Sequence, residues 1–305
     1  MIPSLRLAWT LPRVLAHVVV ALFIVAVLFR FCGDAKRARL IRWWSGRVAK
    51  ICRVELRVIG PPSDPTRGGE IITAALRPGG IGAMLVLNHV SWLDIFIVHS
   101  LRPARFVAKA EIAGWPLLGY LTDRTGAIFI ERGKRHAVRE VNQRAARMLR
   151  DGDLIGMFPE GAVGDGRRLL PFHANLIQPA IDAGVPILVA GLKYRDLQGR
   201  WTSATDYVGD ITMLQSIVRI ARHGPLLAEL HLIDAIDGSA TTRHEVVRKA
   251  RVLIADALAF DDDAHEAAEG VSTVMVMPDD LVVGQDVALT GSQRVMALDA
   301  RDELL

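Results

Sequence analysis

The stretch that decides the fold is MLVLNHVSWLDIFI, residues 84–97. Its first four residues are apolar and predict a short buried strand, whereas the apolar residues that follow Ser91 are typical of the start of a helix. His89 and Asp94 therefore lie at a junction between a strand and a helix. Ser91 and Asp94 also match the capping-box pattern, in which Ser91 is the N-cap and Asp94 lies near the third helical position.

The five-residue separation of His89 and Asp94 has two interpretations. Five residues turn a regular helix by roughly 140°, so the two side chains cannot meet if both lie within it. They can meet if His89 lies in the turn before the helix, which a Ser91 cap would arrange. A carboxylate beside an imidazole fixes its tautomer and makes it a general base near neutral pH. The segment by itself is compatible with a helix start, a catalytic dyad, or both.

Further apolar runs alternate with helical patterns after this junction. The runs that predict strands are 84–87, 105–109, 127–130, 154–158, 185–192 and 226–233. Apolar residues recur at helical spacing from 137 to 149, and Gly152 follows as a stop signal. This alternation predicts a single α/β domain over residues 71–260, with a mostly parallel central sheet flanked by helices.

The N-terminal residues 1–58 are predicted to form a separate membrane arm. From Val14 to Phe29 the chain is apolar apart from His17, and about 20 apolar residues are just enough to span a bilayer. Arg30 follows this run where a signal peptide would have a small-residue cleavage site, so a removed signal is not expected.

A basic segment with two tryptophans comes after the apolar run. Its members are Lys36, Arg37, Arg39, Arg42, Trp43, Trp44, Arg47, Lys50, Arg53 and Arg57. Positive charge beside an apolar segment favours the cytoplasmic side of the inner membrane, and tryptophan favours the headgroup layer. The arm is predicted to be either a transmembrane helix or a helix pair lying on anionic lipid.

Composition excludes several classes of protein. The 305 residues carry a net charge of +4 and 51% hydrophobic residues, and the basic residues follow an apolar run, which favours a bilayer and not a nucleic acid as the partner. Both cysteines, Cys32 and Cys52, fall in the arm, so the body has no cysteine nucleophile. The nine histidines are scattered without ligand spacing, so we expect no metal site. Residues 261–305 are predicted to be an acidic linker and an appendage of unknown role.

Polar clusters follow three of the predicted strands. Asn88 and His89 follow the first, residues 131–133 follow the run that ends at 130, and residues 159–161 follow the run that ends at 158. The carboxyl ends of parallel strands share one edge of a sheet, where such folds bind their ligands. We therefore expect one shared site.

These segments resemble the motifs of a known family, the glycerolipid and lysophospholipid acyltransferases. The resemblance rests on NHVSWLD at 88–94, GAIFIER at 126–132 and FPEG at 158–161, in that order. Lys109-Ala110-Glu111, WPLLG at 115–119 and the block around Pro186 are also similar to family segments. The likeness covers roughly residues 80–235.

The resemblance implies transfer of a fatty acyl group from acyl-CoA or acyl carrier protein to a lysolipid hydroxyl, without a cofactor. His89 would be the general base, Asp94 would orient it, and Ser91 would cap the helix that supports the dyad. The acceptor implied first is 1-acylglycerol-3-phosphate. Residues predicted to bind substrate are Asn88, Lys109, Gly126, Arg132, Glu160, Gly161, Arg167 and Arg168.

One departure from the family pattern concerns the acceptor. The family often continues FPEG with Thr-Arg-Ser, whereas this chain has AVGDG at 162–166 and arginine only at Arg167 and Arg168. This continuation resembles the branch that includes lyso-ornithine lipid acyltransferases. Two other functions stay open at this point: hydrolysis of a thioester or ester by a water that His89 activates, and lipid binding at the membrane without turnover.

Overall fold

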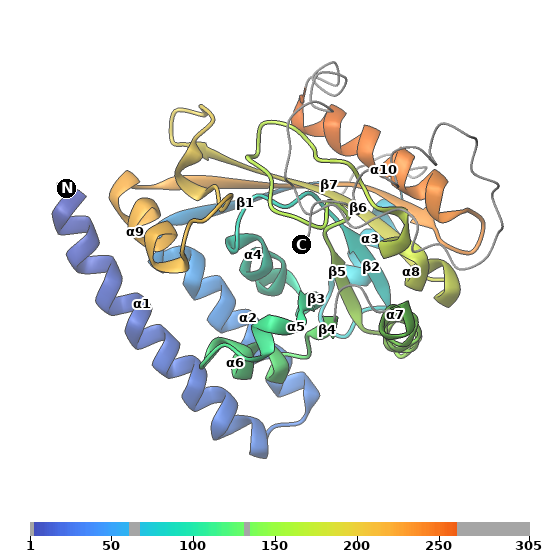
Figure 1. The fold of residues 1–305 in the computed structure, drawn as a ribbon, viewed down its shortest axis with the longest axis horizontal. Coiled ribbons are helices and arrows are strands. Elements are labelled where there is room, and N and C mark those ends of the chain that lie inside the picture. Colours follow the sequence, from blue (N-terminus) through green and yellow to red (C-terminus); the bar gives the residue numbers. More distant parts are fainter. Residues whose placement is uncertain (1–2, 61–67, 131–134, 261–305) are drawn as a thin grey trace, which may run out of the picture.

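In the computed structural model, the described residues are 3–60, 68–130 and 135–260, and within them seven strands form one sheet (Figure 1). The strands are β1 Val54–Ile59, β2 Ala83–Val86, β3 Arg105–Lys109, β4 Ile128–Ile130, β5 Leu154–Met157, β6 Pro186–Asp196 and β7 Leu226–Asp237. Their order is β1-β7-β6-β2-β5-β3-β4, and all neighbours are parallel except β6 and β7. The predicted α/β fold with a mostly parallel sheet is confirmed.

Helices cover both faces of this sheet. They are α1 Pro3–Ala26, α2 Asp34–Ile51, α3 Gly69–Leu76, α4 Leu93–Leu101, α5 Ala110–Ala113, α6 Leu118–Arg124, α7 Arg135–Arg150, α8 Gln178–Ala183, α9 Met213–His223 and α10 Arg243–Leu258, with short 3-10 turns η1 Leu28–Phe31, η3 Ala174–Ile177 and η4 Ser203–Thr205. Strand β2 shows why both faces are covered. Leu85 packs in one apolar cluster with α2, α4 and α9, whereas Met84 and Val86 pack in the other with α7, α8 and α10. Alternate side chains of a strand point to opposite faces, so a strand that is apolar throughout needs cover on both.

The first strand corrects the predicted boundary of the N-terminal arm. The prediction extended a membrane anchor with a basic interfacial helix to residue 58, but α2 ends at Ile51 and Val54–Ile59 forms edge strand β1. This strand pairs in parallel with β7 over Val54↔Leu226 to Ile59↔His231. The end of the basic segment, at Arg57, therefore belongs to the sheet. Its alternation of apolar and charged residues, VELRVI, suits an edge strand with one buried face.

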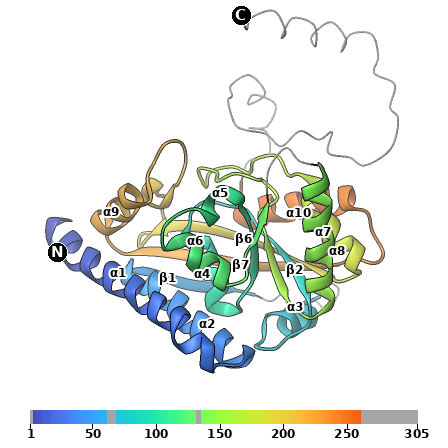
Figure 2. The ribbon, with the colours of Figure 1, turned by 60° about the horizontal axis from the view of Figure 1, so that its bottom comes forward.

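Helix α1 lies along the domain and does not project from it (Figure 1, Figure 2). Near its start, Arg6 donates a hydrogen bond of 2.9 Å to the carbonyl of His223 at the end of α9. Midway, the His17 ring is stacked on Trp44 of α2, with centroids 4.8 Å apart, and each ring N–H donates to the other residue's carbonyl at 2.9 Å. Near its end, Ile24 and Val25 pack with Leu121 of α6. The helix is thus fixed to the body over its whole length.

Candidate active site at the carboxyl ends of the parallel strands

The site begins where two neighbouring strands end. Strands β2 and β5 are paired in parallel up to Val86↔Met157, so the segments that follow them leave the sheet side by side. The backbone N–H of His89 donates a 2.7 Å hydrogen bond to the Glu160 carboxylate oxygen Oε2. The expected meeting of these two polar clusters at one edge of the sheet is found in the structure.

His89 and Asp94 are in direct contact. The His89 Nδ1 and the Asp94 Oδ2 are 2.8 Å apart, the Asp94 side chain is fully buried and the His89 side chain is 16% exposed. Asp94 as acceptor places the proton on Nδ1, because a carboxylate cannot donate. Nε2 of His89 has no hydrogen bond within the part of the chain that the structure describes, so it is the nitrogen that can accept a proton from a substrate.

The start of α4 differs from the predicted capping box. Helix α4 begins at Leu93 with no side-chain cap, and the Ser91 Oγ is buried without a hydrogen-bond partner among the described residues. The Asp94 Oδ2 instead accepts the backbone N–H groups of Val90 at 2.8 Å and Ser91 at 3.0 Å. The prediction that Ser91 caps this helix is therefore wrong. The Asp94 carboxylate reaches back over the turn because it satisfies two orphan N–H donors and the imidazole at once.

The Phe158 ring packs against one face of the His89 imidazole. Its ring is stacked on His89 with centroids 3.8 Å apart and planes 11° from parallel, and Phe106 of β3 stacks on Phe158 at 5.5 Å. A ring packed on one face and hydrogen-bonded at Nδ1 has little freedom to rotate. The stacked ring also favours a transient positive charge on the imidazole.

Glu160 joins two loops at the site. Its Oε2 accepts from His89 N, its Oε1 accepts from Leu170 N at 3.0 Å, and its side chain is buried. The pKa of Glu160 is raised to about 8, chiefly by burial and to a lesser extent by the charges of Asp94 and Asp165, against the two backbone hydrogen bonds, which lower it. The carboxyl group therefore joins the two backbone segments, and its role in headgroup binding stays a prediction.

The loop after Glu160 covers the segment that carries His89. Gly164 N donates to the His89 carbonyl at 2.7 Å, and Gly161 has a φ of +64°, a conformation that glycine adopts without strain. The exposed guanidinium of Arg167 lies 3.8 Å from the centre of the Trp201 ring. Arg168 is exposed as well. Gly161 follows Glu160, whose carboxylate binds the His89 backbone, and Arg167 lies beside Trp201; the roles of Gly161, Arg167 and Arg168 in binding stay predictions.

Two predicted substrate-binding residues have structural roles. The Asn88 side chain donates to the Leu192 carbonyl at 2.8 Å and accepts from the Leu192 N–H at 2.7 Å, so its polar atoms are occupied. Gly126 lies before β4, at the amino end of the parallel strands, and an added Cβ would meet the Arg105 guanidinium at 2.1 Å. These contacts give both residues a structural role, and their part in substrate binding stays a prediction. A match to a whole family motif does not show which of its residues contact substrate and which support the fold.

Two further predicted residues have no described side chain. Lys109 is the last residue of β3, at the same edge of the sheet as the dyad. Arg132 lies outside the described residues.

One residue at the site was missed. Tyr194 of β6 donates a 2.7 Å hydrogen bond from its hydroxyl to the Asp94 Oδ1. The apolar run that predicted this strand ended at Leu192, and Tyr194 lies 100 residues from Asp94. No local pattern could have found it, because the contact depends on β6 extending past the end of β2.

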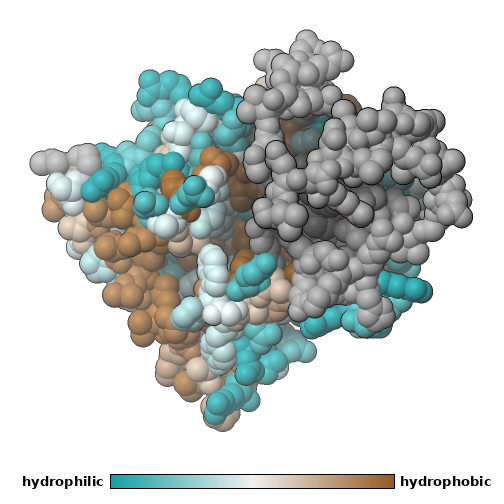
Figure 3. Space-filling view, in the orientation of Figure 1, coloured by the Kyte–Doolittle hydropathy of each residue, from teal (hydrophilic) through white to brown (hydrophobic). Residues whose placement is uncertain are grey.

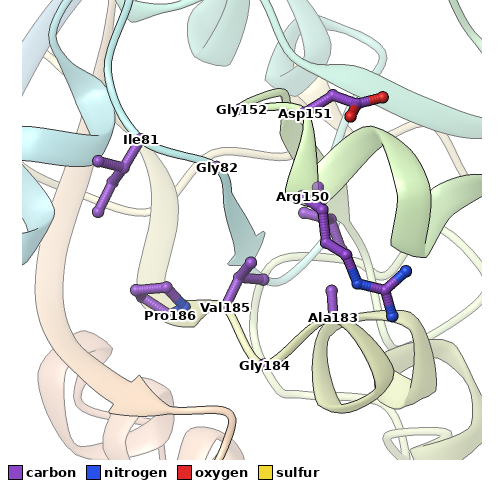
Figure 4. A pocket seen from close by; sticks show the side chains of 10 residues that line it. Ile81, Gly82, Arg150, Asp151, Gly152, Ala183, Gly184, Val185 and Pro186 are labelled. Atoms are coloured by element: carbon purple, nitrogen blue, oxygen red, sulfur yellow. The ribbon is translucent and has the colours of Figure 1, made fainter.

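A cavity lies at the other edge of the sheet. Its volume is about 510 Å³, and residues 81–82, 149–152 and 183–186 line it, in the loops that precede β2, β5 and β6 (Figure 4). Parallel strands put these loops opposite the carboxyl ends, so this cavity is separate from the dyad. No group of three histidine, cysteine or carboxylate side chains suited to a metal ion occurs in residues 3–60, 68–130 and 135–260.

The structure thus defines a class of site, a buried His–Asp pair at the carboxyl ends of an α/β sheet, and comparison with known proteins gives the family of the chain. Residues 69–193 match the family model named Acyltransferase. The lyso-ornithine lipid O-acyltransferase of Pseudomonas aeruginosa is 33% identical over 223 residues, covering 73% of this chain and 79% of that protein. The chain therefore belongs to the acyltransferase family.

Two other similar proteins carry a different description. The 1-acyl-sn-glycerol-3-phosphate acyltransferase of Neisseria gonorrhoeae is 33% identical over 180 residues, covering 57% of this chain and 70% of that protein. The crystal structure of PlsC, the 1-acyl-sn-glycerophosphate acyltransferase of Thermotoga maritima, superimposes with a TM-score of 0.53 and 19% identity, covering 87% of this chain and all of that one. This structural likeness concerns the fold.

Proposed function

We propose that the protein transfers a fatty acyl group from a thioester, acyl-CoA or acyl carrier protein, to the free hydroxyl of a lysolipid. The observation that carries the proposal is the contact between His89 Nδ1 and Asp94 Oδ2, which leaves Nε2 free to accept a proton at the carboxyl ends of the strands. Nε2 takes the proton of the acceptor hydroxyl while the oxygen attacks the thioester carbonyl. The tetrahedral intermediate then expels the thiolate, which takes the proton back from the imidazolium. The products are an ester and a free thiol, with no acyl-enzyme.

Two acceptors fit the proposal, and each rests on its own observation. 1-Acylglycerol-3-phosphate is supported by the neisserial relatives, which carry that substrate in their names. Lyso-ornithine lipid is supported by the longer match to the Pseudomonas protein and by the absence of an arginine directly after FPEG. Arginine binds phosphate through two parallel hydrogen bonds, so its position near the dyad bears on which headgroup is accepted.

A panel of acceptors tests the proposal. Purified full-length protein in lipid vesicles is given labelled acyl-CoA or acyl carrier protein with lysophosphatidate, lyso-ornithine lipid, lysophosphatidylethanolamine or lysophosphatidylglycerol. We expect one of the first two to be acylated with a kcat/KM at least about tenfold above the others, because a site built for one polar headgroup leaves buried groups unpaired with another. Acylation of none of them, or release of free fatty acid without an acceptor, would contradict the proposal, and the second result would indicate a hydrolase.

We also propose that α1 lies in the cytoplasmic surface of the inner membrane and does not cross it. The segment Ser4–Phe31 is long and apolar enough to span a bilayer, with a mean hydropathy of 2.6 over its best window. Six large apolar side chains on it are more than half exposed: Leu5, Trp9, Leu15, Val19, Phe23 and Phe31. They form an apolar ridge on the surface (Figure 3). A crossing α1 would draw the basic helix α2, to which Trp44 ties it, into hydrocarbon at a cost of about 2.5–3.5 kcal/mol for each central charge.

Labelling with an impermeant maleimide distinguishes these two arrangements. A single thiol is introduced by Ser4→Cys in a Cys32→Ser background, since Cys52 is buried. Ala240→Cys, in the exposed turn before α10, marks the side of the membrane that carries the domain. We expect both thiols to be labelled from the same face of sealed vesicles. Labelling from opposite faces would show a crossing helix, and protein that does not sediment with vesicles would overturn the membrane proposal altogether.

A further inference from the structure

Strand β6 continues past the end of β2, and the segment that carries the dyad is attached to this extension. Backbone pairing of β2 with β6 ends at Val86↔Val189. Beyond it, the Asn88 amide pairs with both backbone groups of Leu192, and the Tyr194 hydroxyl donates to Asp94 Oδ1 at 2.7 Å. Residues 192 and 194 are two apart on a strand, so their side chains point to the same face. Strand β6 thus binds the active-site turn at both ends of the turn, at Asn88 and at Asp94.

The contacts of Asp94 divide between its two oxygens. Oδ2 accepts from the His89 Nδ1 and from the N–H groups of Val90 and Ser91, all within 3.0 Å. Oδ1 accepts from Tyr194, and Asp94 is 0% exposed, so water does not reach it. A buried carboxylate oxygen without a donor is costly and disfavours the charged form. Tyr194 supplies that donor.

Other ionisable groups also face this pair. They are His89 and Glu160, which lie beside Asp94, and the Cys52 thiol at the end of α2, which acts on Tyr194. Burial raises the pKa of Cys52 to about 12, so the thiol is neutral near pH 7. Burial, followed by the charge of Asp94, raises the pKa of Tyr194 well above its usual value of 10. The phenol therefore keeps its proton and remains a donor over the working range of pH.

We propose that Tyr194 is a positioning residue of the dyad, whose hydroxyl holds the Asp94 carboxylate ionised and turned so that Oδ2 faces His89. This inference rests on the proposed function, because it assumes that His89 is the general base. Tyr194 touches neither substrate nor His89 and acts through Asp94. Its effect should appear in kcat and in the pH dependence, and much less in KM.

The sign of the pH effect follows from the direction of the hydrogen bond. The positive end of the hydroxyl dipole points at Asp94, so removing it makes the potential at His89 more negative and stabilises the imidazolium. It also makes Asp94 easier to protonate, because one oxygen loses its donor. Both changes favour inactive, protonated forms of the pair. Loss of the hydroxyl therefore moves the acid limb of the kcat/KM profile to higher pH.

The experiment compares Tyr194→Phe with wild type between pH 5 and pH 9, using the acceptor and donor that the panel selects. We expect kcat to fall about tenfold to a hundredfold, as for loss of one hydrogen bond to a charged group. The KM of the acceptor should stay within about twofold, and the acid limb should move up by about half a pH unit or more. Tyr120→Phe, at an exposed tyrosine of α6, is the matched control and should behave as wild type.

A second substitution covers the case in which Tyr194→Phe does not fold. 3-Fluorotyrosine at position 194 keeps the hydroxyl and makes it a stronger donor, so the acid limb should move to lower pH. An unchanged limb in every variant that folds, with wild-type kcat, would overturn the role of Tyr194. If His89→Ala is inactive in the same assay, that result leaves the proposed function intact. Full activity of His89→Ala would instead overturn the role of His89 as general base, on which this inference rests, and failure of the wild type to acylate any acceptor of the panel would overturn the proposed function itself.

Discussion

Replacing His89 with alanine will lower acyl transfer by about 10² to 10⁴-fold, the usual contribution of a general base. The fold should survive, because the backbone contacts of this residue remain after the imidazole is removed: its N–H donates to Glu160 and its carbonyl accepts from Gly164. Asp94 also keeps three donors, from Val90, Ser91 and Tyr194. The loss is therefore expected in kcat, measured with labelled acyl-CoA and the preferred lysolipid.

The control for this variant is another histidine. His244→Ala removes an exposed imidazole from α10, on the other face of the sheet, and should leave the rate unchanged. Both variants should be recovered with the membrane fraction in equal amounts. Wild-type turnover in His89→Ala would exclude general-base catalysis by this residue and would require another mechanism of acyl transfer.

Replacing Asp94 with asparagine will separate the charge of this residue from its hydrogen bonds. The asparagine Oδ1 can take the place of Oδ2 and accept from His89, Val90 and Ser91, while its amide donates to the Tyr194 hydroxyl, which can rotate to accept. The geometry should thus persist without the negative charge. We expect a fall in kcat of about 10² to 10⁴-fold with a nearly unchanged thermal unfolding midpoint.

The pH dependence gives this variant a second readout. Without the carboxylate, the imidazolium loses its stabilising partner, so the acid limb of the kcat/KM profile moves to lower pH. This direction is opposite to that expected for Tyr194→Phe. Asp256→Asn, at an exposed carboxylate of α10, is the matched control. Unaltered kcat in Asp94→Asn would mean that the carboxylate only caps the helix, which was the simpler interpretation of this sequence.

Most strands could be predicted because their residues are apolar on both faces. Five of the predicted runs overlap β2, β3, β5, β6 and β7 closely, and the run 127–130 contains the short β4. β1 was missed because Arg53 and Arg57 continue the basic pattern of the preceding helix. Its partner β7 lies about 170 residues away, as in the pair Val54↔Leu226. A half-buried edge strand can be identified only from the strand with which it pairs, and that pairing is decided by the tertiary structure.

The sequence alone determined the family, and it predicted His89 and Asp94 as the reacting pair. The NHVSWLD segment follows a buried strand, and this order by itself brings His89 and Asp94 into one turn, because both lie within seven residues of one another. Local contacts of this kind depend on the rotation of the chain over a few residues, which residue type and spacing specify.

The tertiary structure decided how that pair is held. The pattern Ser91-x-x-Asp94 suits a serine cap, yet Asp94 makes the helix-start contacts, because its carboxylate lies where the imidazole, two backbone donors and Tyr194 converge. Asn88 and Glu160 likewise make backbone contacts with Leu192 and Leu170 that no local pattern predicted. These partners come from strands and loops far apart in the chain. Their meeting depends on strand order and register, which arise from packing the whole sheet between its helices.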